Sequence, residues 1–158
     1  DEYEVYITPT YQSAAEILDA GIEIIALDAT PRRRPGGETP EEILRQIREH
    51  YPDALVMGEI STLEEAERII PMGFDLISTT LSGYTRESQE VKAVNLDLIR
   101  QIHAITDIPI IAEGKIRCEQ EAVEALKAGA HAVVVGTSIT RPEIITERYV
   151  EAIREAED

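Results

Sequence analysis

Hydrophobic and polar positions along the chain follow two alternating periods. Short apolar runs such as 22–29, 54–60 and 108–112 are typical of buried strands, and each precedes a stretch with apolar residues every three or four positions. That spacing is typical of an amphipathic helix. The first segment, 3–8, instead alternates apolar and polar residues and predicts a half-exposed strand that Pro9 ends. The pattern therefore predicts strict alternation of strands and helices.

The remaining predicted elements continue this order to the end of the chain. We expect helix 13–20, strand 22–29, loop 30–40, a helix ending near residue 50, strand 54–60, a helix ending near residue 73, strand 74–80, loop 81–92, helix 94–105, strand 108–112, helix 119–128, strand 130–135 and helix 142–155. Capping boxes beginning at Ser13 and Ser61, and Pro40 in a first turn, mark three helix starts.

A weak repeat occurs where helices lead into strands. Gly21, Gly73 and Gly129 each follow a helix and precede one apolar and one polar residue, as tandem βα units require. A parallel sheet follows from this order. Periodicity leaves two α/β architectures open, an open doubly wound sheet and a (β/α) barrel.

Composition narrows the class of protein. The 158 residues, 43% of them hydrophobic, support one core, so we expect a single domain over 1–158. A formal net charge of −16 argues against nucleic acid and anionic membranes as partners, whereas a phosphorylated metabolite requires only a locally positive site. The single cysteine, Cys118, with no secretory pattern and no bilayer-spanning apolar run, predicts a cytoplasmic protein.

Polar side chains follow four of the predicted strands. Asp28, Glu59, Thr79 with Thr80, and Glu113 stand where parallel strands emerge from a core, the usual place for chemistry in α/β enzymes. Three acidic groups at one edge are costly to desolvate unless they are paired or used. The alternative is that each carboxylate caps the following helix or pairs with an arginine in a neighbouring loop.

Glycines after two strands predict an anion site. Gly114-Lys115 and Gly136-Thr137 would let a phosphate approach backbone amides closely, as in barrels that use their last two βα loops. Arg141 either adds a charged contact or pairs with a glutamate on its own helix. Arg32, Arg33 and Arg34 are expected to form a solvated loop, with closure over an anion as the alternative. The spacing of histidines, cysteine and acids indicates no metal site.

Six ordered motifs are similar to one known family. They are Val5–Thr10, Ile25–Thr30, Ile60–Glu65, Ser78–Thr85, Ala112–Gly114 and Ile139–Pro142. On these residues the whole chain resembles the N-acylmannosamine-6-phosphate 2-epimerases, bacterial enzymes of the ribulose-phosphate-binding barrel type.

The resemblance implies a (β/α)8 TIM barrel that interconverts N-acetylmannosamine 6-phosphate and N-acetylglucosamine 6-phosphate in sialic acid catabolism. Proton transfer at C2 would proceed with no metal or organic cofactor. Glu113 and Glu59 match the family's catalytic acids, although Glu59 replaces a usual aspartate. Arg141 matches a residue near the substrate, with Asp28 and Thr79 as further expected substrate contacts. The phosphate would lie at Gly114, Lys115, Gly136 and Thr137.

The resemblance also predicts which part of the barrel is represented. We expect the last five βα units, without strands one to three and without the lysine that ends the family's third strand. An open five-stranded sheet exposes an apolar edge and is expected to aggregate or to form a homodimer unless further strands cover it. The alternatives are another sugar-phosphate barrel enzyme, such as a lyase or synthase, and a non-catalytic half-barrel that binds a phosphosugar.

Overall fold

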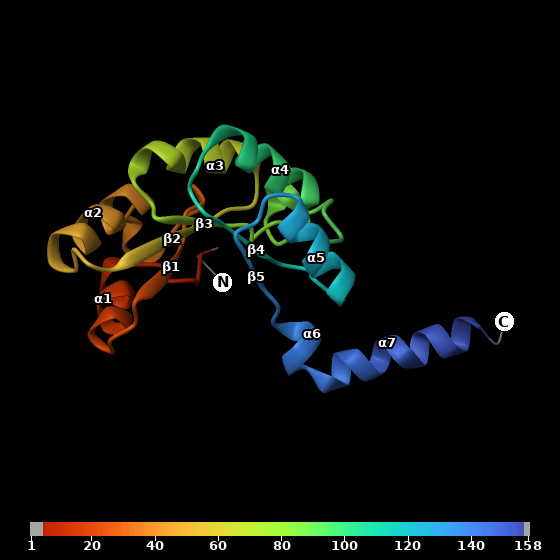
Figure 1. Cartoon of the computed structure of the whole chain (residues 1–158). Coiled ribbons are helices and arrows are strands. Elements are labelled where there is room, and N and C mark those ends of the chain that lie inside the picture. Colours follow the sequence, from red (N-terminus) through yellow and green to blue (C-terminus); the bar gives the residue numbers. More distant parts are fainter. Residues whose placement is uncertain (1–4, 157–158) are drawn as a thin grey trace.

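The chain folds into one curved parallel sheet with helices along its outer side. The computed structural model describes residues 5–156, and Figure 1 shows α1 to α5 arching over the strands while the N-terminal segment lies on the concave side. The elements are α1 (Tyr11–Asp19), β1 (Ile24–Asp28), η1 (Pro35–Gly37), α2 (Pro40–His50), β2 (Leu55–Glu59), α3 (Leu63–Ile69), η2 (Ile70–Met72), β3 (Leu76–Ser78), η3 (Arg86–Ser88), α4 (Leu96–Ile105), β4 (Ile110–Glu113), α5 (Glu119–Lys127), β5 (Ala132–Val134), α6 (Thr137–Thr140) and α7 (Pro142–Glu155).

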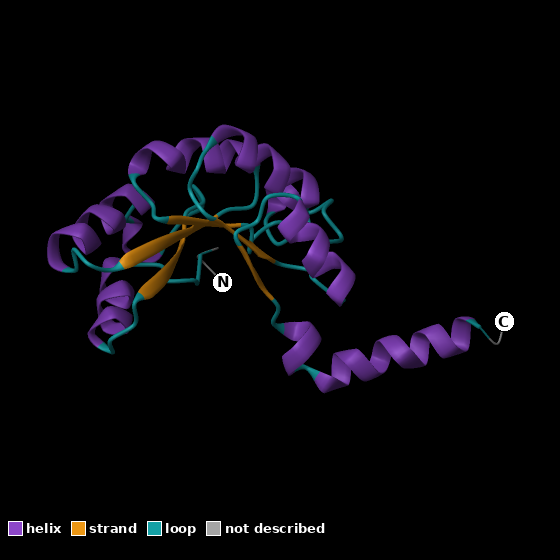
Figure 2. Cartoon of the chain, in the orientation of Figure 1, coloured by secondary structure: helices purple, strands orange, loops and turns teal. Residues whose placement is uncertain are grey.

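The strand order decides between the two architectures that periodicity left open. The strands are hydrogen-bonded in the order β1-β2-β3-β4-β5, and every pair is parallel. A doubly wound sheet reverses its strand order at a switch point, whereas a (β/α) barrel adds each strand beside the previous one. The consecutive order and the helices on one side, coloured in Figure 2, confirm the barrel class.

The hydrophobic core lies between the helices and the outer face of the sheet. Isoleucine and leucine side chains of β1 and α2 are fully covered there, among them Leu27, Ile43 and Ile47. The same buried core extends toward β4 through Ile69, Ile77, Ile99 and Ile102. Because this core needs one apolar stripe per helix, the predicted 3.6-residue periodicity was a correct guide to helix orientation.

The first predicted strand, 3–8, is not formed over its described residues. Tyr3 and Glu4 lie outside the described residues, and residues 5–8 contain no strand. Thr8 has a φ of +45°, which breaks an extended conformation, and its hydroxyl donates to the carbonyl oxygen of Ala26 at 2.6 Å. The segment therefore contacts β1 through the Thr8 side chain and one backbone hydrogen bond, in which the Asp28 N–H donates to the Ile7 carbonyl at 3.4 Å, instead of through a strand ladder.

Two helix starts differ from the predicted capping boxes by a few residues. Thr10, not Ser13, caps α1, because its side chain accepts the Ser13 N–H. Thr62, not Ser61, caps α3 in a capping box with Glu65. Several hydroxyl residues precede each helix and any of them can cap it, so the sequence alone did not choose between them. The predicted start of α2, with Pro40 in the first turn, is confirmed, and Thr39 is its N-cap.

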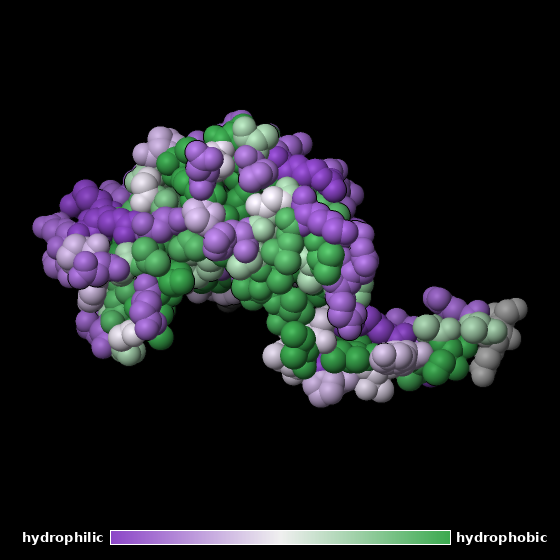
Figure 3. Space-filling view, in the orientation of Figure 1, coloured by the Kyte–Doolittle hydropathy of each residue, from purple (hydrophilic) through white to green (hydrophobic). Residues whose placement is uncertain are grey.

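The final helix does not pack against the sheet. Figure 1 shows α6 and α7 extending away from β5, and Figure 3 shows apolar surface along α7. Tyr149 and Ile153 are 69% and 59% exposed. The predicted bounds of α7 are correct, and the short helix α6 before it was not predicted. Within residues 5–156, no helix is long and apolar enough to cross a membrane.

Gly58 in β2 provides a test of the packing between sheet and helices. A Cβ built there would lie 2.7 Å from Ile69 Cδ1 and 3.0 Å from Phe74 Cδ1, both in the buried core. We expect Gly58→Ala to lower the free energy of unfolding by about 1–3 kcal/mol through overpacking. Chemical denaturation measures this. Glu67→Ala on the exposed face of α3 is the control, expected to stay within about 0.5 kcal/mol of wild type. Equal stabilities for Gly58→Ala and wild type would contradict this packing.

Candidate active site

A cleft of about 660 Å³ lies at the carboxyl ends of β4 and β5. Its walls come from the N-terminal segment, the loops after β3 and β4, and the chain from β5 into α7. Among the lining residues are Thr80, Glu113, Gly114, Lys115, Gly136 and Thr137. The structure thus brings one predicted acid and all four predicted phosphate contacts into a single cavity.

Two neighbouring threonines hold Glu113 in place. Thr79 is buried, and its hydroxyl donates to the Glu113 carbonyl at 3.0 Å and accepts the Glu113 N–H at 3.2 Å. Thr80 Oγ1 donates to Glu113 Oε2 at 3.0 Å. Thr79 therefore fixes the backbone of Glu113 and Thr80 orients its carboxylate. The role of Thr79 as a substrate contact stays a prediction.

Glu59 ends β2 and is only 4% exposed. Its Oε2 is buried and has no hydrogen-bond partner among the described residues. The pKa of its carboxyl is raised to about 7, chiefly by burial and also by the negative charges of Glu113 and Asp28. Near neutral pH the Glu59 carboxyl is therefore poised between its neutral and charged forms.

Asp28 is bound by its own loop. Its Oδ1 accepts the Thr30 N–H and hydroxyl at 2.9 and 2.6 Å, and its Oδ2 accepts from Arg32 at 2.5 Å. Arg34, predicted to be solvated, is 2% exposed and donates to the Asp28 and Thr30 carbonyls. Burial lowers the pKa of the Arg34 guanidinium, while the Asp28 charge opposes that shift.

The prediction of a solvated arginine loop is therefore wrong for Arg32 and Arg34. Their guanidinium groups fold back onto the end of β1, because a buried carboxylate requires charge-assisted partners. The open alternative, that an acid at a strand end pairs with a loop arginine, holds for Asp28. Its contact with substrate stays a prediction.

Lys115 lines the cleft and packs against Tyr84, another lining residue. Its backbone φ is +59°, and its Nζ lies 4.0 Å from the centroid of the Tyr84 ring. Gly83 makes this possible, since a Cβ there would lie 2.2 Å from Lys115 Cε. Desolvation lowers the pKa of the Lys115 ammonium, and the nearby charges of Lys92 and Arg117 lower it further. Lys115 and Arg117 line the cleft and Lys92 lies near them, so positive charge gathers on this side of the cleft, as an anion site requires.

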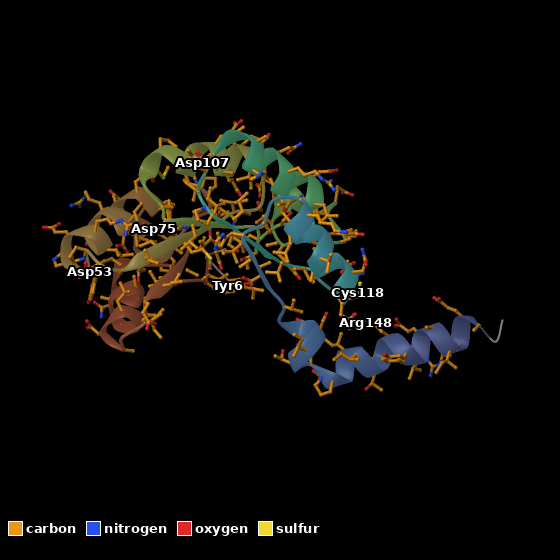
Figure 4. All side chains as sticks on the ribbon, viewed as in Figure 1. Tyr6, Asp53, Asp75, Asp107, Cys118 and Arg148 are labelled. Carbon is orange, nitrogen blue, oxygen red and sulfur yellow. The ribbon has the colours of Figure 1, made fainter. Side chains whose placement is uncertain are left out.

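The sequence reasoning missed two arginines of the cleft, Arg117 and Arg148. Arg148 on α7 donates to the Arg117 carbonyl at 3.2 Å and to Ser138 Oγ at 3.3 Å. Figure 4 shows Arg148 near Cys118, the residue after Arg117. No sequence motif indicated either residue, because their proximity depends on how the chain runs from β5 through α6 into α7. The same face of α7 contributes two glutamates, Glu147 and Glu151, to the lining.

Arg141 is not brought into the cleft. It is exposed at the junction of α6 and α7, where its Nε pairs with the Glu143 carboxylate. This is the alternative that the sequence left open for it, and its contact with substrate stays a prediction. Among residues 5–156, no group of three or more histidine, cysteine or acidic side chains is placed to hold a metal ion.

The buried Glu59 carboxyl predicts a specific dependence of stability on pH. Its folded pKa of about 7 exceeds the ordinary 4.5, so the folded chain binds the proton more tightly than the unfolded chain. The stabilisation that this proton provides, about 3 kcal/mol in the free energy of unfolding, is fully present below about pH 4.5. It is lost as the pH rises through about 7.

Glu59→Gln mimics the neutral acid and should lack this loss. Relative to wild type, we expect the variant to gain stability as the pH rises from about 4 to 8, measured by chemical denaturation. Glu64→Gln, at an exposed position of α3, is the matched control and should follow wild type. Parallel curves for Glu59→Gln and wild type would show that Glu59 ionises normally.

Known proteins match this chain over nearly all of its length. The profile of the family described as "Putative N-acetylmannosamine-6-phosphate epimerase" matches residues 1–155. A relative with the corresponding 2-epimerase description, from Caldanaerobacter subterraneus subsp. tengcongensis, is 51% identical over 97% of this chain and 65% of its own length. One from Enterobacter sp. (strain 638) is 45% identical over 95% of this chain.

Solved structures agree with the sequence matches. The N-acetylmannosamine-6-phosphate 2-epimerase from Clostridium perfringens has a TM-score of 0.90 and 43% identity, over 96% of this chain and 66% of that one. A thiamine phosphate pyrophosphorylase from Pyrococcus furiosus, with a TM-score of 0.58 and 22% identity, shares the fold alone. The chain spans about 65% of the length of the first relative. With the family profile matched over residues 1–155, this chain belongs to the N-acetylmannosamine-6-phosphate 2-epimerase family.

Proposed function

We propose that this chain forms part of an enzyme that interconverts N-acetylmannosamine 6-phosphate and N-acetylglucosamine 6-phosphate by proton transfer at C2. The observation that carries the proposal is the single cleft in which Glu113 adjoins Gly114, Lys115, Gly136 and Thr137. A carboxylate beside an anion-binding wall suits a substrate with an acidic C–H at one end and a phosphate at the other. Family membership supports the same substrates.

The chemistry assigns a proton-transfer role to Glu113. Epimerisation removes the C2 proton from one face of the carbon and returns a proton to the other face, so two groups must flank it. Glu113 serves one face, with its carboxylate oriented by Thr80 and its backbone by Thr79. Glu59, buried nearby, adjusts the charge around Glu113. By resemblance, the second group is the lysine that ends the family's third strand.

The phosphate is assigned to the part of the cleft formed by Gly114, Lys115, Gly136 and Thr137. Gly114 has a φ of +98°, and a Cβ there would approach the Thr80 carbonyl oxygen to 3.1 Å, so glycine is required at this turn. Lys115 would exchange its contact with Tyr84 for a phosphate oxygen. A dianion would also relieve the mutual repulsion of Lys92, Lys115 and Arg117.

We further propose that the five βα units are the C-terminal part of a single eight-unit barrel domain. The support is that β1 and β5 are both edge strands among the described residues, so the sheet is curved but not closed. Three more units between these edges would close the ring and supply the lysine.

Solvent exchange at C2 tests the reaction. We expect the active protein, its intact mass verified, to incorporate deuterium at C2 of N-acetylmannosamine 6-phosphate in deuterated water, followed by NMR. Glu113→Gln should lower that rate by about 10²- to 10⁴-fold, because the amide cannot accept the proton. Glu119→Gln, an exposed glutamate of α5, is the matched control. An unchanged rate for Glu113→Gln would remove Glu113 from the mechanism, and binding without exchange would favour a non-catalytic phosphosugar-binding role.

The exposed apolar side chains of α7 support the proposal that this chain forms a homodimer. Tyr149, Val150 and Ile153 expose apolar side chains on α7, a helix that stands away from the body of its own chain. Two such helices, each covering the other's apolar side, would bury this surface. We assign the surface to a second copy of this chain, because the described chain itself leaves it uncovered.

Association should depend on those apolar side chains. We expect sedimentation of the purified chain to show a dimer, and Ile153→Glu combined with Tyr149→Glu to shift it toward monomer by at least about tenfold in dissociation constant. Glu155→Gln, at the end of the same helix, should leave association unchanged. A wild-type monomer, or a dimer unaffected by the double change, would contradict this surface assignment.

A further inference from the structure

Arg148 on α7 connects two segments that follow different strands. Its Nη1 donates to the Arg117 carbonyl at 3.2 Å, in the loop after β4, and its Nη2 donates to Ser138 Oγ at 3.3 Å, in the segment after β5. The Ser138 hydroxyl in turn donates to the Ile116 carbonyl at 2.8 Å. One guanidinium group and one hydroxyl therefore hold the two segments together.

The four residues assigned to the phosphate lie directly before this bridge. Residues 114–115 precede Ile116, and residues 136–137 precede Ser138. The pairing of β4 with β5 ends at Glu113, so the strand ladder does not reach the two pairs of phosphate contacts. Their separation depends instead on the hydrogen bonds that join the two segments.

The segment after β5 is weakly anchored by its own packing. None of the four residues of α6 is buried, and its N-cap residue, Gly136, provides no side-chain hydrogen bond. Hydrophobic burial therefore does not fix α6 against the sheet. The Ser138 hydroxyl, which contacts both the loop after β4 and Arg148, is the contact that places Gly136 and Thr137 relative to that loop.

The guanidinium of Arg148 also carries an unbalanced charge. Glu147 and Glu151 line the same cleft, yet no carboxylate among residues 5–156 forms an ion pair with Arg148. Its Nε is buried and has no hydrogen-bond partner within the same range. A partly buried cation without a counter-charge is costly, so an anion in the cleft would stabilise it.

We propose that Arg148 is a positioning residue for the phosphate. It ties the loop after β4 to the segment after β5, so that residues 114–115 and 136–137 form one cradle, and it adds an unpaired positive charge to that cradle. The proposal deepens the epimerase function, on which it rests for the identity of the anion. Arg148 then sets the affinity for the phosphate end of the substrate and takes no part in proton transfer at C2.

Titration of the full chain with inorganic phosphate, followed by amide NMR, measures the bridge without turnover. Arg148→Ala should raise the dissociation constant at least about tenfold. Arg148→Lys keeps the charge, but a single ammonium cannot span both acceptors, so we expect an increase of at least about threefold. Arg154→Ala, at an exposed position near the end of α7, removes the same charge and should stay within about twofold of wild type.

Two results of this titration would overturn the proposal. Equal losses of affinity in Arg148→Ala and Arg154→Ala would show that only net charge matters. Wild-type affinity in Arg148→Lys would show that the bridge between the two segments does not matter. If Arg148→Ala does not fold, Arg148→Gln removes the same charge with a longer side chain and carries the same expectation.

A kinetic measurement separates positioning of the phosphate from general damage to the site. In the active protein, Arg148→Ala should raise KM for N-acetylmannosamine 6-phosphate at least about tenfold and leave kcat within about threefold of wild type. A fall in kcat with KM unchanged would overturn the proposal. Absence of C2 exchange in wild type would contradict the epimerase function, whereas the titration with inorganic phosphate would still decide the role of Arg148.

Discussion

The register of the parallel strands is the constraint on which the site depends. Asp28 at the end of β1 pairs in register with Glu59 at the end of β2, and Glu59 pairs with Ser78 at the end of β3. Glu113 ends β4 two residues beyond the partner of Ser78, on the same face as that partner. Parallel pairing therefore brings acids that are distant in sequence to one edge, whatever the loops between them do.

Concentrating three carboxylates at one edge has an electrostatic cost, and the structure offsets it differently for each. Asp28 is neutralised by arginines that fold back from its own loop. Glu113 keeps partial contact with the cleft and accepts from Thr80. Glu59 has neither an arginine nor full hydrogen bonding among the described residues, so burial raises its pKa. The site thus combines an acid paired with arginines, an acid that lines the cleft, and a buried acid whose pKa is raised.

Much of this framework was predictable from the sequence because it depends on local rules. Alternating periods gave the element order, and Gly21, Gly73 and Gly129 do adopt the positive φ values that end each helix before a strand. The buried runs identified the strands, and their polar ends identified Glu59 and Glu113. The glycines after β4 and β5 indicated the part of the cleft that is assigned to the phosphate, because a residue without Cβ lets an anion approach the backbone amides closely.

The parts that sequence reasoning missed depend on tertiary contacts. The burial of Arg34 follows from a loop that folds onto β1, which no composition rule can distinguish from a solvated arginine run. The different roles of Thr79 and Thr80 depend on the face to which each side chain points once β3 has ended at Ser78. Arg148 reaches the cleft only because α7 leaves β5 at a particular angle.

The cleft at the ends of β4 and β5 is assigned to a sugar phosphate beside Glu113. Amide NMR of the chain titrated with N-acetylmannosamine 6-phosphate tests it most directly, with inorganic phosphate as the reference ligand. The sugar phosphate should shift the amides of Gly114, Lys115, Gly136 and Thr137 together with that of Glu113, whereas phosphate alone should shift only the first four. Shifts confined to the opposite ends of the strands, or none at saturating ligand, would contradict the assignment of this cleft.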